Sequence, residues 1–223
     1  MNRWLKTFLQ TVIVAAVPVV LVVMPIRVLM HPRWVYFEYG RPDFPPDPFG
    51  FTPQERTRLA LTGIESIIGP RGVVVLQEAR FSDNTPAFNE REVGHMQDVR
   101  GVTGSVYFAQ VVLLIAAAIA VVVLVRGGAP DAASGAVLTG AVVTVVLLVA
   151  LVVLVLTSFD TFFTTFHRVF FSGNTWLFNY TDTLIRLYPV PFWFDAAAAI
   201  GVTSIVEALV LGALAWRWGR AVR

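Results

Sequence analysis

Two histidines lie in the segments that contain most of the chemically useful side chains of this chain. His167 is within FDTFFTTFHRVFFSGNTWLFNYTDTLIRLYPVPFWFD, residues 159–195, which separates two long apolar runs. His95 is within FNEREVGHMQDVR, residues 88–100, which leads into another apolar run. An imidazole titrates near neutral pH, so it can accept and return a proton there. Because a histidine at membrane depth is costly without partners, we consider both residues candidates for acid–base chemistry.

The residues around His95 have the spacing of one helix face. On a helix over residues 88–100, Glu92 and Asp98 would lie three residues either side of His95, and Arg91 four residues before it. Side chains three or four residues apart on a helix can meet. We therefore predict that Glu92 or Asp98 orients His95, and that Arg91 is available to hold an oxyanion or a lipid phosphate.

His167 has more distant orienting candidates on its own helix. Thr164 and Asp160 would share its face, three and seven residues earlier. Asp160 would lie about 10 Å along the helix axis, so it could reach His167 only through Thr164 or another segment. The same stretch contains further candidates for substrate binding, one tryptophan and two arginines: Trp176, Arg168 and Arg186.

Other polar residues have structural explanations. His31 follows the first apolar run and precedes a proline, so we interpret it as an interfacial side chain. Asp182 precedes TLIRLY and Asp195 opens the last apolar run, which is typical of helix N-caps. The aromatic residues of 159–195 also fit a membrane-anchoring belt that happens to contain one histidine.

The composition identifies an integral membrane protein. Of 223 residues, 56% are hydrophobic and 14% are charged, and the mean hydropathy is +0.69. A soluble domain would carry nearer a quarter charged residues. The chain has no cysteine, which excludes disulfides, a thiolate nucleophile and a cysteine-ligated metal. The basic excess lies at membrane flanks, so we expect no nucleic-acid partner.

The apolar runs divide the chain into four predicted spans, since about 20 helical residues cross a hydrocarbon core of about 30 Å. The predicted order is transmembrane helix 7–30, extracytoplasmic domain 31–105, helix 106–125, cytoplasmic loop 126–134, helix 135–157, extracytoplasmic aromatic segment 158–194, helix 195–216 and cytoplasmic tail 217–223. The predicted fold is therefore an α-helical integral membrane protein with a small extracytoplasmic domain between helices 1 and 2.

Residues 31–105 are expected to form an α+β domain. Residues 34–39 alternate like a short strand, and residues 72–81 (GVVVLQEARF) resemble another strand. Thr52-Pro53-Gln54-Glu55 has a capping threonine, a proline at the first helical position and a glutamate three residues after the cap. This pattern predicts a helix over residues 53–68 that ends at Gly69-Pro70.

Charge predicts the orientation. The N-terminus, loop 126–134 and the C-terminal tail carry six basic residues and one acidic residue, a net charge of +5. Segments 27–105 and 158–195 carry eleven basic and thirteen acidic residues, a net charge of −2. Lys and Arg concentrate in short cytoplasmic loops. We therefore expect both termini in the cytoplasm, and both histidine segments on the outer face.

The two histidine segments resemble a known family. FNEREVGHMQDVR, followed after a span and a loop by FDTFFTTFHRVFFSGNTWLFNYTDTLIRLYPVPFW, is similar to the integral membrane family of the bacterial lipoprotein intramolecular transacylase, Lit. The resemblance covers the four-span layout, is specific in these two blocks and is weak in residues 31–87. It implies a bacterial cytoplasmic-membrane enzyme whose two functional histidines correspond to His95 and His167.

The resemblance also implies the reaction and its partners. Family members act on diacylglyceryl lipoproteins among membrane phospholipids, and move the sn-2 acyl chain to the amine of the N-terminal cysteine. That transfer requires a neutral amine, a base for its proton and donors for the developing oxyanion. No Ser, Cys or Thr is evidently activated as a nucleophile, so direct transfer without an acyl-enzyme fits best. We expect no cofactor or metal, and a chain able to act as a monomer.

Two other classes of function remain open. His95, His167, Asp98 and Asp160 could supply ligands for a metal-dependent membrane hydrolase, although no tight ligand spacing is present. Alternatively, the chain is a non-enzymatic membrane protein whose outer domain binds a partner or lipid. Metal analysis would test the first reading, and replacing both histidines by alanine would test the second.

Overall fold

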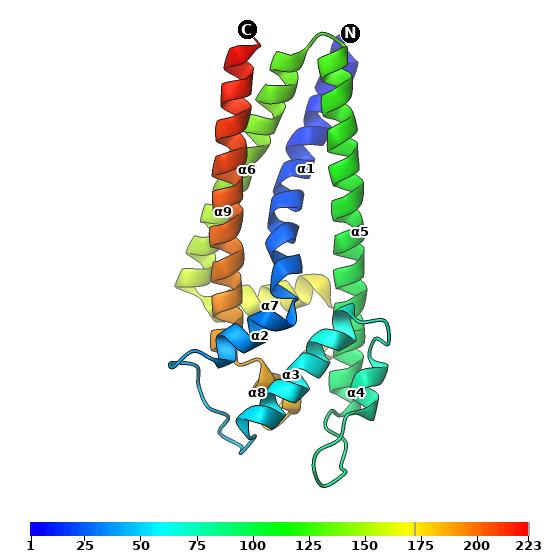
Figure 1. The fold of residues 1–223 in the computed structure, drawn as a ribbon, viewed down its shortest axis with the longest axis vertical. Coiled ribbons are helices and arrows are strands. Elements are labelled where there is room, and N and C mark those ends of the chain that lie inside the picture. Colours follow the sequence, from blue (N-terminus) through cyan, green and yellow to red (C-terminus); the bar gives the residue numbers. More distant parts are fainter. Residues whose placement is uncertain (172, 223) are drawn as a thin grey trace. The chain divides into compact units, whose positions relative to one another are not determined.

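The structure, a computed structural model, describes residues 1–171 and 173–222 and is helical throughout (Figure 1). Within these residues the helices are α1 (Arg3–Leu29), α2 (Pro32–Tyr39), α3 (Pro53–Ile68), α4 (Val74–Glu78), α5 (Glu90–Arg126), α6 (Pro130–Thr157), α7 (Phe159–Phe170), α8 (Thr183–Leu187) and α9 (Val190–Ala221). Among the described residues, four helices are long and apolar enough to cross a membrane: α1, α5, α6 and α9. The expectation of four apolar spans is confirmed.

The chain forms two compact units, each built from segments distant in sequence. The first unit contains Met1–Ile26, Val106–Thr157 and Ala198–Arg223, and it consists of the apolar parts of the four long helices. The second unit contains Arg27–Ser105 and Ser158–Ala197, and it includes both histidine segments.

Small residues and backbone acceptors position the helices of the first unit. A Cβ at Gly140 of α6 would come within 2.8 Å of Val17 on α1, so only glycine permits this approach. Pro25 of α1 has no N–H, which leaves the Leu21 carbonyl without its usual intrahelical donor. The buried Ser204 of α9 donates to that carbonyl at 3.2 Å. Helix α1 can therefore continue through Pro25 to Leu29.

Glu207 lies near the middle of the last predicted span, and we expect it to face the helix bundle, either protonated or bonded to a Ser or Thr of a neighbouring helix. The structure leaves its Oε2 atom buried without a hydrogen-bond partner among the described residues. Glu207 does lie in the apolar part of α9, within the first unit.

The second unit has its own apolar core. Members of α2, α3, α4, α5, α8 and α9 contribute to it, and the most buried are Val35, Leu59, Ala60, Leu76, Ala87, Leu184, Leu187 and Phe192. The predicted helix over residues 53–68 is confirmed as α3. Thr52 accepts from the backbone N–H of Glu55 at 3.2 Å, and Pro53 is the first helical residue. At the C-terminal end of α3, Arg100 of α5 donates to three carbonyls: those of Ser66, Ile67 and Gly69.

The predicted strands are wrong. Residues 34–39 lie in α2, because Pro32 occupies its first position and the His31 ring caps it by accepting from the Arg33 N–H at 3.2 Å. His31 is therefore a helix cap. Residues 74–78 form the short helix α4, and the only strand-like pairing in the described chain is an isolated bridge between Arg80 and Pro86. An apolar run without a partner strand is stabilised instead by packing Val75 and Leu76 into the core.

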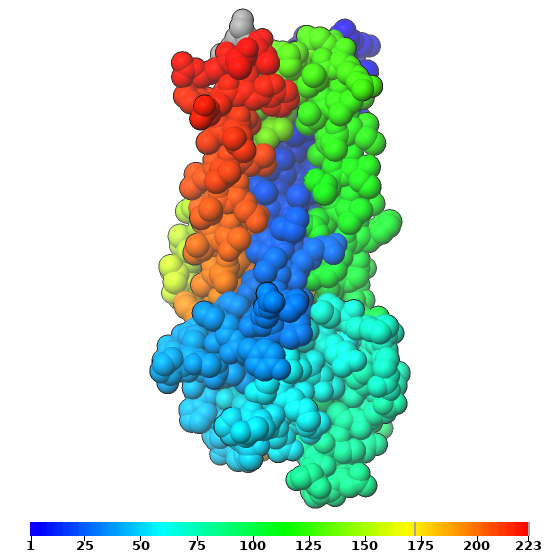
Figure 2. Space-filling model, in the orientation of Figure 1, coloured from blue at the N-terminus to red at the C-terminus, as the bar shows by residue number. Residues whose placement is uncertain are grey.

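Helices α2 and α3 form one face of the second unit (Figure 2, blue and cyan). A shallow groove of about 510 Å³ lies on this face, lined by Tyr36, Pro53, Gln54, Thr57, Arg58 and Leu61. Neither histidine lines it.

Candidate functional site

The start of α5 is built around Asn89 and Glu92. The Asn89 side chain accepts from the Glu92 N–H at 3.0 Å, and Glu92 Oε2 accepts from the Asn89 N–H at 2.8 Å. This reciprocal pair is a capping box that fixes where the helix begins. The other carboxylate oxygen, Oε1, accepts from the backbone N–H of Leu184 in the first turn of α8 at 2.6 Å. Glu92 therefore accepts hydrogen bonds at the N-terminal ends of both α5 and α8.

The structure thus gives Glu92 a different task from the predicted one. Its side chain is 1% exposed, and burial raises the pKa of its carboxyl group. Both oxygens are taken by backbone donors, so Glu92 does not hydrogen-bond His95. The helix periodicity shows which side chains can reach His95. It does not show that other hydrogen-bond donors already occupy the Glu92 carboxylate.

Helix α7 positions His167 through its own backbone. Ser158 caps the helix by accepting from the Thr161 N–H, and His167 lies in the last turn. His167 Nδ1 is 2.7 Å from the carbonyl oxygen of Phe163, four residues earlier. A carbonyl can only accept, so Nδ1 carries the proton. In the neutral ring Nε2 therefore has a free lone pair.

The two histidines lie next to each other. Their ring centroids are 6.0 Å apart and the rings are inclined by 23°. His95 also contacts Phe171 and Phe178, at centroid distances of 5.1 and 5.3 Å. The further ring partners of His167 are Phe163, Phe166, Phe171 and Trp176. Aromatic side chains from α7 and the segment after it therefore enclose both imidazoles.

This enclosure changes the titration of both rings. Burial lowers the pKa of His95 to about 4; the neighbouring His167 adds to the shift and Asp98 opposes it. Burial also lowers the pKa of His167, while its bond to the Phe163 carbonyl opposes the shift. Because both pKa values lie below 6.5, both rings are neutral at pH 7. Both histidines belong to the second unit, outside the apolar parts of the long helices.

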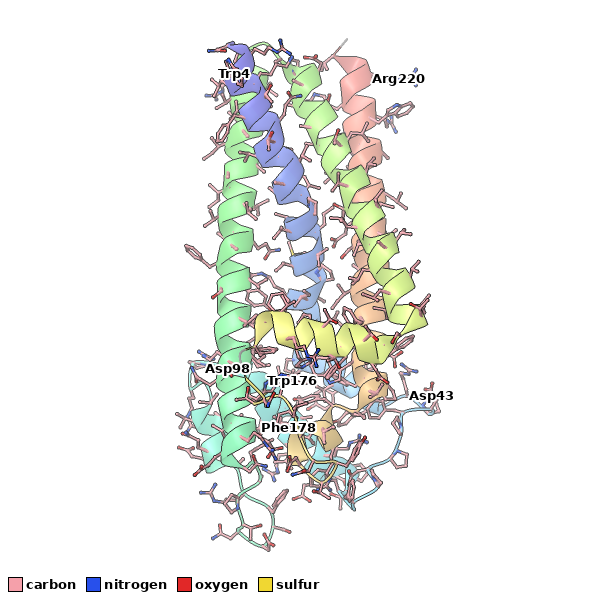
Figure 3. All side chains as sticks on the ribbon, turned by 180° about the vertical axis from the view of Figure 1, so that it is seen from behind. Trp4, Asp43, Asp98, Trp176, Phe178 and Arg220 are labelled. Atoms are coloured by element: carbon pink, nitrogen blue, oxygen red, sulfur yellow. The ribbon has the colours of Figure 1, made fainter. Side chains whose placement is uncertain are left out.

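The segment between α7 and α8 attaches to α5 beside the histidines. Thr175 donates to Asp98 Oδ2 at 3.3 Å, and the ring of the next residue, Trp176, lies 4.9 Å from that of His167. Figure 3 shows Asp98 on α5, and Trp176 and Phe178 in the segment below α7. Asp98 therefore holds this segment, and it lies near enough to His95 to influence its charge.

The predicted substrate-binding arginines differ in their availability. Arg91 pairs with Asp182 at 3.0 Å, and Asp182 also accepts from the Asn89 side chain. Arg186 makes two bonds to Asp47, whose side chain is fully buried, and its guanidinium stacks on the Phe51 ring at 3.5 Å. The Arg186 guanidinium is therefore paired within the protein and is not available to bind a substrate phosphate.

Arg168 is the predicted arginine with a free guanidinium. It is exposed, and it forms no hydrogen bond or ion pair within residues 1–171 and 173–222. It follows His167 directly in the last turn of α7. Arg168 is therefore the most accessible cation beside the histidine pair.

The remaining predicted residues form no hydrogen bond with either histidine among the described residues. Asp160 is exposed, and Thr164 forms no hydrogen bond with His167, whose Nδ1 is held by the backbone instead. Asp182 precedes α8 as expected, but its carboxylate makes no capping bond there. Asp195 is not an N-cap, because α9 begins at Val190; its carboxylate pairs with Arg41 at 2.6 Å.

Sequence reasoning missed two parts of the site. The Phe163 carbonyl carries no side-chain signal, although a histidine in the last turn of a helix can reach a carbonyl four residues earlier. The Asn89-x-x-Glu92 spacing is a capping-box signature and was readable from the sequence. Nothing in the described part of the chain gathers three His, Asp or Glu side chains as a metal site.

Comparisons with known proteins give the family. The family described as lipoprotein intramolecular transacylase Lit matches residues 11–193 of this chain. An uncharacterized protein from Aquifex aeolicus (strain VF5) is 30% identical over 207 residues, 93% of each chain.

Solved structures give the fold. The structure of the membrane integral lipoprotein intramolecular transacylase Lit from Bacillus cereus has a TM-score of 0.71 at 18% identity, covering 99% of this chain and 98% of that chain. A variant of that protein in which one histidine is changed to arginine gives a TM-score of 0.65 at 17% identity, covering 97% of this chain and 92% of that chain. The fold is shared at this low identity, and the family match covers most of the sequence. The chain therefore belongs to the lipoprotein intramolecular transacylase Lit family of membrane enzymes.

Proposed function

We propose that this enzyme transfers the sn-2 acyl chain of a diacylglyceryl lipoprotein to the amine of its N-terminal cysteine, with His167 as the general base. Membership of the family supports the class of reaction. The observation that carries the assignment of His167 is the bond from its Nδ1 to the Phe163 carbonyl. That bond leaves Nε2 as the proton acceptor, on a ring that burial keeps neutral.

The first step forms the carbon–nitrogen bond. The neutral cysteine amine attacks the carbonyl carbon of the sn-2 ester, and the carbonyl π electrons move to the oxygen. The proton released by the amine passes to His167 Nε2. An α-amine titrates near 8, so part of it is neutral at pH 7, and a nearby neutral imidazole is suited to take its proton.

The second step breaks the ester. The oxyanion re-forms the carbonyl, the bond to the glycerol oxygen breaks, and His167 Nε2–H returns the proton to that oxygen. The products are an amide on the cysteine nitrogen and a free sn-2 hydroxyl, so no water or co-reactant is consumed. His167 ends the cycle neutral and ready to act again.

His95 is assigned to the oxyanion. Its side chain is 8% exposed, and its Nδ1 atom is buried with no hydrogen-bond partner among the described residues. A neutral ring with a protonated Nδ1 offers a hydrogen-bond donor at no cost in buried charge. Because the rings of His95 and His167 are 6.0 Å apart, one carbonyl group bound between them can meet both.

Direct transfer suits this arrangement better than an acyl-enzyme. The chain has no cysteine, and neither neighbouring hydroxyl is bonded to His167: Thr175 donates to Asp98, and Thr164 has no bond to the ring. The amine and the ester belong to one substrate molecule, so their proximity comes with the substrate. A covalent intermediate is therefore unnecessary.

The test is the conversion of a diacylglyceryl lipopeptide to its lyso-form, followed by mass spectrometry with the parent enzyme and two variants. General-base assistance contributes about 10²–10⁴-fold, so His167→Ala should reduce the rate by that factor. His31→Ala is the control, because His31 caps α2 and makes no ring contact with either histidine. Full activity of folded His167→Ala would overturn the assignment.

A further inference from the structure

We propose that the indole N–H of Trp176 is a second donor to the oxyanion, so that the tetrahedral intermediate is held between Trp176 and His95. This inference rests on the proposed function, because it names a further catalytic residue for the same transfer.

The first observation is a buried donor without an acceptor. Trp176 Nε1 is inaccessible to solvent and has no hydrogen-bond partner in residues 1–171 and 173–222. A buried tryptophan usually pairs its N–H, and one left unpaired is costly. A ligand oxygen at this position would satisfy it.

The second observation is where that donor lies. The centroid of the Trp176 ring is 4.9 Å from that of the His167 ring, and the centroid of the His95 ring, on α5, is 6.0 Å from that of His167. The His95 Nδ1 atom is the other buried ring nitrogen of this cluster without a partner among the described atoms. Two unsatisfied nitrogens thus accompany His167, whose tautomer is fixed by the Phe163 carbonyl with the lone pair on Nε2. This is the inventory that acyl transfer requires, namely one base and two oxyanion donors.

The third observation is that Trp176 is fixed. The Leu177 N–H donates to the Asn174 carbonyl at 3.1 Å, which closes a turn around Thr175 and Trp176. The Thr175 hydroxyl donates to Asp98 on α5. A donor that is already in place requires no reorganisation when charge develops on the substrate oxygen. The surrounding phenylalanines lower the local polarity and so strengthen a hydrogen bond to an anion.

The chain provides a matched control. Trp34 of α2 also has a buried Nε1 without a partner in the described chain, and it packs against Phe37 and Phe192. Neither histidine is among its ring contacts. Replacing Trp34 by Phe therefore removes the same kind of N–H from the same unit, away from the proposed chemistry.

The experiment compares Trp176→Phe and Trp34→Phe in purified, detergent-solubilised enzyme with the diacylglyceryl lipopeptide. Phenylalanine retains an aromatic ring against His167 but has no donor. Loss of one oxyanion donor lowers kcat by about 10²–10³-fold. We expect that loss in Trp176→Phe with KM changed only a few-fold, and nearly full kcat in Trp34→Phe. Equal kcat values for Trp176→Phe and the parent would overturn the proposal.

A second measurement uses the parent protein and so does not depend on the folding of a variant. The chain has six tryptophans, and ¹⁵N labelling resolves their indole N–H signals by NMR. A lipopeptide with a phosphonate in place of the sn-2 ester mimics the oxyanion. Its binding should move the Trp176 signal downfield and leave the Trp34 signal in place. An unmoved Trp176 signal with the phosphonate bound would overturn the proposal.

His167→Ala distinguishes the two levels of failure. If His167→Ala is inactive and Trp176→Phe is fully active, the base assignment stands and the indole donor is wrong. If His167→Ala is fully active, the proposed function fails and the donor role falls with it.

Discussion

At the residue scale, the two histidines of the site, His95 and His167, lie in different environments. His167 has its Nδ1 proton fixed by a carbonyl, whereas His95 is more deeply buried and its Nδ1 has no hydrogen-bond partner among the described residues. Acid–base roles are separated when the surroundings of two titratable groups differ in this way. The histidine with an oriented lone pair suits a base, and the histidine held neutral suits a donor.

The lowered pKa values predict how the site responds to acid. Between pH 6.5 and about 4 the unfolded chain protonates His95 while the folded chain does not, so the unfolded state binds more protons. The contribution of His95 to stability must therefore fall as the pH falls through this range. The apparent thermal midpoint should drop from pH 7 to pH 5 by more in the parent than in His95→Ala.

NMR titration of the imidazole C–H signals gives the direct check. His95 should titrate near 4 and His167 below its ordinary value of 6.5, with signals assigned by His95→Ala and His167→Ala. A midpoint above 6.5 for His95 would contradict the burial on which its donor role rests.

The sequence was informative about the histidines and less so about their partners. Residue type, position beside apolar runs and family resemblance marked His95 and His167, and the structure places them together. The orienting residues were chosen by helical reach, which cannot show that Glu92 is occupied by two backbone N–H groups. The Phe163 carbonyl was missed, since every residue has a carbonyl and only the fold decides which one is used.

At the element scale, Glu92 couples α5 to α8. Glu92→Ala leaves the Leu184 and Asn89 N–H groups without their acceptor, and losing bonds to a buried charged group costs about 1.5–3 kcal/mol each. For the two bonds together we expect a loss of about 3–6 kcal/mol in unfolding free energy, measured by denaturant titration in detergent. Glu92→Gln retains an acceptor and should lose less.

The activity of Glu92→Ala separates a structural role of this carboxylate from a catalytic one. Both carboxylate oxygens of Glu92 accept from backbone N–H groups and neither bonds His95, so Glu92→Ala should lose less activity per folded molecule than His167→Ala does. Equal stability of Glu92→Ala and the parent would show that neither helix start depends on this carboxylate.

Ser204 gives a second test at this scale, because its bond compensates for Pro25. Hydrogen bonds between membrane helices contribute about 0.6 kcal/mol on average and about 1.7 kcal/mol at most. Ser204→Ala should destabilise by that amount, whereas Thr203→Ala, an exposed neighbour on α9, should not. In a Pro25→Ala background the Leu21 carbonyl regains a helix donor, so Ser204→Ala should then cost less. Additive effects in this double-mutant cycle would contradict the compensation.

The elements themselves were predictable where local chemistry and packing agree. For α3 a threonine cap, a proline at the first position and a terminal glycine all mark the same helix. For α2 the alternation of residues 34–39 suggested a strand, but Pro32 and the cap from His31 start a helix, which buries Val35 and Glu38 on one face. Six residues are too few for periodicity to outweigh capping, and a strand needs a partner that the sequence does not specify.

At the scale of the whole molecule, the site depends on two distant segments belonging to one unit. Residues 27–105 and 158–197 are joined by bonds such as Tyr39 to the Leu187 carbonyl at 2.7 Å and Thr183 to the Ala87 carbonyl at 2.6 Å. Segments that pack together in this way must lie on the same side of a membrane. By connectivity, the apolar parts of α1, α5, α6 and α9 each lead into this unit at one end only.

The last prediction is the side on which that unit lies. The opposite ends of the four helices carry the N-terminus, the turn after Arg126 and the C-terminal tail, whose net charge is +5 against −2 for residues 27–105 and 158–195. Because Lys and Arg favour short cytoplasmic loops, the histidine pair should face outward. Alkaline phosphatase fused after Ser82 should be active, and fused after Gly128 it should be inactive; a cytoplasmic fluorescent reporter should give the reverse pattern. Inverted signals would place the histidines on the cytoplasmic side, away from lipoproteins exposed at the outer surface. Equal signals at the two positions would contradict the predicted order of spans.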